Sequence, residues 1–94
     1  MTNETHEARV KRLYMRSIRR GIKEMDLILS AYAAAHLNGL SDDDLALYDA
    51  LLAENDHDIL SWVTGHAQEP EQYRAIMDDI RGLAEGLTRP GAAL

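Results

Sequence analysis

The stretch RRGIKEMD, residues 19–26, decides how the first third of this chain folds. A glycine, Gly21, interrupts a region whose apolar residues otherwise recur with the period of a helix. One unbroken helix over residues 6–37 would be about 48 Å long, although a domain of this size has a radius of gyration of only about 12 Å. Because glycine costs a helix interior about 1 kcal/mol relative to alanine, we expect the chain to break at Gly21.

The apolar spacing predicts one helix on each side of this break. The upstream helix should cover about residues 6–19, and its apolar face is formed by Val10, Leu13, Tyr14, Ser17 and Ile18. The downstream helix should cover about residues 22–37. Asn38-Gly39 follows it, and glycine is the favoured residue just beyond a helix C-terminus.

Three more helices are predicted in the rest of the chain. Ser41, followed by three aspartates, is a typical N-cap, and it places a helix over about residues 42–53. A short fourth helix, capped by Asp56, should end at Gly65. The fifth covers about residues 70–85, because its apolar residues again recur at helical spacing.

These elements predict an all-α fold, a compact bundle of five short helices. No segment alternates apolar and polar residues in the manner of a strand. We expect a single helical domain over residues 1–94, ordered over about 6–85, with 86–94 as a flexible tail that contains two glycines and a proline. Trp62, the only tryptophan, has two interpretations, a core residue or a half-exposed anchor for a partner.

The charges are divided unevenly along the chain. Residues 1–23 hold seven Arg or Lys and two Glu, a net charge of +5, whereas residues 24–94 hold three basic and fourteen acidic residues, a net charge of −11. A basic first segment is typical of a docking surface for an acidic partner. Nucleic acid is the alternative partner, but the acidic remainder opposes it and no motif for reading bases accompanies the arginines.

The sequence lacks the motifs and spacings that are typical of common catalytic and metal sites. The chain has no cysteine, its four histidines show no ligand spacing, and its six glycines form no phosphate-binding loop. The run NDHD, residues 55–58, resembles a metal site only superficially. Five short helices leave little room for a deep pocket, so we expect a small interaction module. It should not be an enzyme, and it should hold no metal and no stably bound cofactor.

The sequence also carries expectations about location. No apolar run approaches the roughly 18 residues of a membrane span, so we expect no membrane insertion. The first twelve residues are polar and include Glu4 and Glu7, unlike a signal or transit peptide. On this basis we expect a cytoplasmic protein.

A longer motif overlaps the break at Gly21. Residues 20–26 read R-G-x-x-E-x-D, which resembles the signature of the SdhE family of FAD assembly factors, also called succinate dehydrogenase assembly factor 2. The resemblance continues upstream in RLYMRSIRRG (residues 12–21), which is similar to the basic first helix of the family. Downstream it continues in LSDDDLALYDALLAENDHDILSW (residues 40–62).

This resemblance implies a function. Members of the family are small five-helix proteins that bind the flavoprotein subunit of succinate dehydrogenase, and in bacteria often that of fumarate reductase. They promote covalent attachment of FAD to a histidine of that subunit. FAD would therefore be bound to the partner and not to this chain. We expect this chain by itself to be a monomer. The alternatives are a generic helical adaptor that uses the basic first helix, and a weak nucleic-acid-binding regulator.

The resemblance also implies which residues meet the partner. Arg20 would offer its planar guanidinium to acceptors on the partner, and Glu24 would accept from the partner or orient Arg20. Gly21, which lacks a side chain, would let another backbone approach closely. The residues predicted to bind the partner are Arg16, Arg20, Gly21, Lys23, Glu24 and Asp26.

Overall fold

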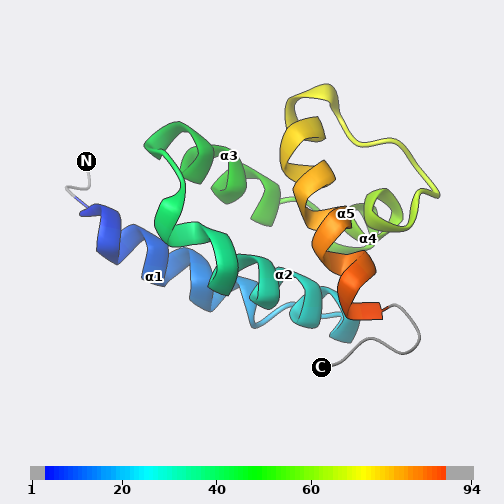
Figure 1. Cartoon of the computed structure of the whole chain (residues 1–94), viewed down its shortest axis with the longest axis horizontal. Coiled ribbons are helices and arrows are strands. Elements are labelled where there is room, and N and C mark those ends of the chain that lie inside the picture. Colours follow the sequence, from blue (N-terminus) through cyan, green and yellow to red (C-terminus); the bar gives the residue numbers. More distant parts are fainter. Residues whose placement is uncertain (1–3, 89–94) are drawn as a thin grey trace.

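The computed structural model describes residues 4–88, and that part of the chain is built from helices without any strand (Figure 1). The five α-helices are α1 (His6–Ser17), α2 (Lys23–His36), α3 (Asp42–Leu52), α4 (Asp56–Thr64) and α5 (Arg74–Thr88). Two short 3-10 helices join them, η1 (Leu37–Gly39) and η2 (Glu71–Tyr73). The predicted all-α fold of five short helices is confirmed.

The helix ends follow local hydrogen-bonding signals. Ser41 caps α3 by accepting a hydrogen bond from the Asp44 N–H at 3.1 Å. Gly65 ends α4 with a positive φ of 82°, the left-handed conformation that glycine adopts without strain. The fifth helix continues to Thr88, into the tail expected at 86–94, and the rest of that tail (89–94) lies outside the described residues.

The break in the chain brings α1 and α2 side by side (Figure 1). The longest dimension of the described part is 44 Å, shorter than the helix that residues 6–37 would form without a break. Within the described residues, no helix is both long and apolar enough to cross a membrane.

The core lies where the inner faces of all five helices meet. Its fully buried side chains come from each helix: Leu13, Met25, Leu29, Leu45, Leu51, Ile59, Met77 and Ile80. Trp62 is only 8% exposed and stacks on Tyr73 with a distance of 5.9 Å between ring centroids. The interpretation of Trp62 as a core residue is therefore confirmed.

A buried polar pair fastens the end of α1 to α3. The Ser17 hydroxyl donates to the Leu13 carbonyl at 2.8 Å, so the Tyr48 hydroxyl, 2.6 Å away, is the donor to Ser17 Oγ. Burial raises the pKa of Tyr48 to about 12. Because the phenol stays protonated and partnered, the last turn of α1 is held in place directly before the Gly21 break.

Candidate functional site

The predicted site residues Arg20 to Asp26 surround the turn between α1 and α2. Residues 18–22 lie between the two helices, and α2 begins at Lys23. The Asp26 carboxylate folds back over this turn and accepts a hydrogen bond from the Arg20 N–H at 2.5 Å. We refer to residues 20–26 as the corner. Asp26 is half-buried and holds the corner closed.

Arg20 turns its side chain into the protein. Its Nε donates to Asp56 Oδ1 at 2.6 Å, its Nη1 to the Leu52 carbonyl at 2.9 Å and its Nη2 to the Glu54 carbonyl at 3.4 Å. Only 10% of the side chain is exposed. The Leu52 carbonyl, at the C-terminus of α3, lacks a partner within the helix. The guanidinium satisfies it, also bonds to the Glu54 carbonyl beyond the helix, and so anchors the corner to the link between α3 and α4.

This geometry gives the Arg20 side chain partners within the chain, which the motif did not predict. The Nε, Nη1 and Nη2 atoms of the guanidinium already donate to Asp56, Leu52 and Glu54, so acceptors on a partner would compete with these bonds. Glu24 does not orient the guanidinium, because Asp56 makes the carboxylate contact with Arg20. Direct contact between Arg20 and a partner is untested and stays a prediction.

The role predicted for Asp56 from the sequence was wrong. Asn55 caps α4, with its Oδ1 accepting from the His57 N–H at 2.8 Å, so the expected cap at Asp56 is wrong. Asp56 is the first residue of α4, and it joins Arg20 to the Gly21 N–H, which donates to Asp56 Oδ2 at 3.1 Å. An acid at a helix start looks the same whether it caps the helix or pairs across the fold, so no local signal identified this role.

The exposed residues of the corner are Gly21, Lys23 and Glu24. Gly21 has no positive φ, and a Cβ there would meet nothing closer than Asp56 Oδ2 at 3.8 Å, an ordinary contact. Neither conformation nor internal space therefore requires glycine at this position. Within residues 4–88, the Glu24 carboxylate makes no hydrogen bond or ion pair.

Arg16 lies further back on α1 and pairs with α3. Its Nη1 donates to Asp49, which also accepts from Arg12 Nη2 at 3.3 Å. Burial alone would raise the pKa of Asp49, but the hydrogen bonds from the two arginines outweigh it and hold that pKa below its ordinary value. Arg16 thus pairs within the chain, and it lines one surface pocket together with Arg20 of the corner.

These pairings also bear on the alternative functions. Three of the seven basic residues in 1–23 pair with carboxylates of the same chain: Arg12, Arg16 and Arg20. The basic segment 1–23 is therefore less available for nucleic acid or an acidic partner than its number of basic residues suggests. Among the described residues, no group of three or more acidic or histidine side chains is placed to hold a metal ion.

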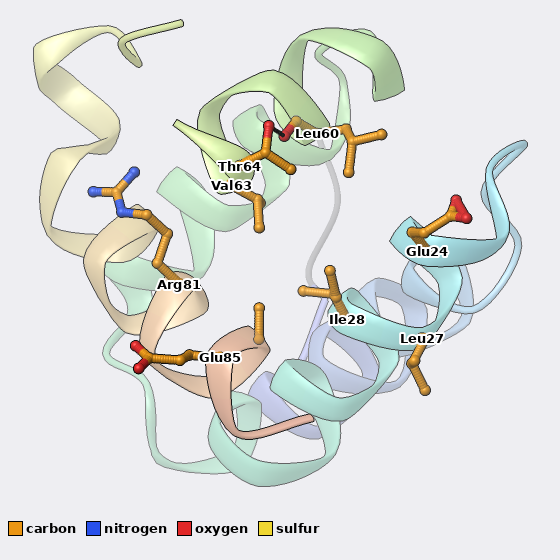
Figure 2. A pocket seen from close by; sticks show the side chains of 9 residues that line it. Glu24, Leu27, Ile28, Leu60, Val63, Thr64, Arg81 and Glu85 are labelled. Carbon is orange, nitrogen blue, oxygen red and sulfur yellow. Dashed lines mark hydrogen bonds between the residues drawn. The ribbon is translucent and has the colours of Figure 1, made fainter. Parts of the chain in front are cut away.

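An apolar groove opens beside the corner (Figure 2). It lies between α2, α4 and α5 and has a volume of 530 Å³. Its apolar lining comes from Leu27, Ile28, Leu60, Val63 and Ala84. Glu24 lies at its edge and belongs to the corner as well, so the two features form one continuous surface. The groove was not predicted from the sequence, because it forms only where residues of three separate helices meet.

Comparison with known proteins gives matches over most of the chain. Residues 11–84 match the family described as "Flavinator of succinate dehydrogenase" (Sdh5). The chain is 51% identical to "Succinate dehydrogenase assembly factor 2, mitochondrial" of Meyerozyma guilliermondii, over 67% of this chain and 47% of the relative. It is 39% identical to "Succinate dehydrogenase assembly factor 2-A, mitochondrial" of Drosophila yakuba, over 93% of this chain and 57% of the relative.

These names contradict the expected cytoplasmic localisation. The relatives, including one from Candida glabrata with 48% identity over 77% of this chain, are all named mitochondrial. This chain spans about half the length of the curated relatives that it matches. The expectation rested on the polar residues 1–12. The relatives are about twice as long as this chain, so these residues do not decide the localisation of the family.

Proposed function

Since the chain belongs to the family described as flavinator of succinate dehydrogenase, we propose that it binds the flavoprotein subunit of that enzyme and promotes its covalent flavinylation with FAD. Family membership confirms the resemblance drawn from the R-G-x-x-E-x-D motif. The observation that carries the proposal is the match over residues 11–84, which includes the whole corner.

We propose that the chain acts as a chaperone rather than as an enzyme. Its contribution would be to hold the flavoprotein in the arrangement that aligns the flavin with the histidine that receives it. Such positioning accelerates a reaction without any catalytic group from this chain. The sequence has no glycine-rich loop for a pyrophosphate, which supports the proposal that FAD stays with the partner.

The geometry of the corner supports different roles for the predicted residues. Gly21, Lys23 and Glu24 are exposed and would contact the flavoprotein directly. Arg20 and Asp26 would keep that surface in its shape, because their side chains bond within the corner and to α4. Preorganised contacts lose less entropy on association, so a fixed corner favours binding.

Further details of the partner belong to the same proposal. We propose the flavoprotein subunit of fumarate reductase as a second partner, as the resemblance implies. The chain would act as a monomer, with one corner for one flavoprotein. Arg16, although paired with Asp49, is 35% exposed and would lie at the edge of the contact.

Co-expression with the flavoprotein subunit in cells that lack their own assembly factor tests the proposal. Covalent flavin, measured by fluorescence of the denatured subunit in a gel, should rise when this chain is present. Glu24→Ala should remove most of that rise, whereas Glu7→Ala is a matched control, because Glu7 is also exposed but lies in the first turn of α1. Equal covalent flavin with and without the chain would refute the proposed function.

A further inference from the structure

The groove beside the corner is large enough to bind side chains of another protein. At 530 Å³ it falls within the range of about 300–1,000 Å³ typical of ligand-binding clefts. Figure 2 shows Ile28 and Val63 directed toward the open space from α2 and α4. Leu27, also in the lining, is 52% exposed, so the apolar surface continues outside the groove. Exposed concave apolar surface of this kind is a common feature of interaction sites.

The charges around the groove are acidic. Among the described residues that line the groove, Arg81 is the one basic residue, and its guanidinium donates to Glu69 at 2.6 Å and to Asp78 at 2.5 Å. The positive charge is therefore balanced within the chain. Glu24 lies on the same rim, is exposed, and makes no hydrogen bond or ion pair within residues 4–88. An occupant with a positive charge next to its apolar part would complement this rim.

We propose that the groove binds a short segment of the flavoprotein subunit that carries apolar side chains beside a lysine or arginine. This inference rests on the proposed function and names the kind of segment that the chain recognises. The apolar side chains would enter between α2, α4 and α5, and the basic residue would meet Glu24. Because Glu24 lies in both the corner and the groove, the segment extends the corner contact without a gap.

Measuring the affinity of the purified flavoprotein subunit for groove variants tests this inference. Val63→Asp and Leu27→Asp place a charge where the apolar side chains would lie, and neither residue belongs to the corner. Each should weaken binding by at least about tenfold, since burying an unpaired charge at the centre of an interface costs more than 1.4 kcal/mol. Ala46→Asp, at an exposed position of α3, is the control and should leave the affinity unchanged.

The same variants also show whether a loss of binding is caused by a loss of folding. Leu27 is half exposed, so Leu27→Asp should melt within a few degrees of the unchanged chain even if Val63→Asp is destabilised. A photoreactive residue at position 27 should then crosslink to the flavoprotein. The crosslinked peptide should contain apolar residues next to Lys or Arg.

The outcomes separate this inference from the proposed function. If the unchanged chain binds the flavoprotein and Leu27→Asp binds equally well, the groove is not the receptor, although the proposed function stands. If the unchanged chain does not bind at all, the proposed function and this inference both fail. A crosslink to an acidic segment would overturn the inference. A dimer abolished by Leu27→Asp with flavoprotein binding unchanged would also overturn it, since the occupant would then be a second copy.

Discussion

Removing Asp56 should loosen the corner although Asp56 lies outside the R-G-x-x-E-x-D motif. Asp56 accepts from the Arg20 guanidinium and from the Gly21 N–H, at 2.6 Å and 3.1 Å. The Arg20 side chain is 10% exposed and the Asp56 side chain 21%, so the pair is screened less than a surface salt bridge. Losing one partner of a buried pair costs about 3–5 kcal/mol, whereas an exposed pair contributes at most about 1 kcal/mol.

We therefore expect Asp56→Ala to lower the free energy of unfolding by about 2–3 kcal/mol, between these limits. For a domain of this size, that corresponds to a fall in Tm of roughly 10–20 °C. Asp58→Ala is the matched control, because Asp58 lies in the same first helical turn but is exposed. It should cost less than about 1 kcal/mol, the contribution of a carboxylate to the helix dipole.

A double-mutant cycle isolates the contact itself. Urea unfolding of Arg20→Ala, Asp56→Ala and the double variant should give a coupling energy of about 1.5–3 kcal/mol. Covalent flavin on the flavoprotein should be measured at a temperature where all variants are folded. It should fall to a similar extent in both single variants, because each removes the contact that fixes the corner.

Two results would refute this reasoning. A coupling energy below about 0.5 kcal/mol would mean that the pair does not hold the corner. Full flavinylation with Asp56→Ala and none with Arg20→Ala would mean that the arginine acts on the partner directly, as the motif alone suggested.

Three further predictions follow from the same structure. Leu51→Ala should lower the free energy of unfolding by about 2–5 kcal/mol in a urea melt, because Leu51 is fully buried, and a cost below about 1 kcal/mol would contradict its place in the core. Gly21→Ala should leave Tm within about 2 °C, since a Cβ has room there, but weaken flavoprotein binding in a titration; a variant that unfolds would contradict the room that the structure leaves for a Cβ. Hydrogen bonds from Arg81 lower the pKa of Glu69, which favours the folded state above the ordinary pKa of 4.5, and this stability is lost as the pH falls through the lowered value. Melts from pH 7 down to pH 2 should show a decline below about pH 4.5 that is smaller in Glu69→Gln, and an equal decline would contradict the pairing.

The helices were predictable because their signals are local. Ser41 reaches an N–H three residues away, and Gly65 ends α4 through its own φ. The apolar spacing placed Leu13 and Ser17 on the inner face of the first helix before any packing was known, and both are buried. The break at Gly21 followed from a comparison of length with domain size. Each of these inferences needs only neighbouring residues or the chain length.

The roles of the corner residues were not predictable in the same way. The motif identifies Arg20, Gly21, Glu24 and Asp26, but it does not distinguish the residues that shape the corner from those that are exposed. That distinction depends on Asp56, 36 residues after Arg20, and on the carbonyl groups at the end of α3.

The sequence by itself therefore determined the all-α fold, the helices and the family, because periodicity, capping and the motif are written in consecutive residues. Only the tertiary structure decided that Arg20 turns inward while Glu24 remains exposed, and that α2, α4 and α5 leave a groove beside it. The physical reason is that an ion pair or a groove requires groups from distant segments, and helix packing alone sets the distances between them.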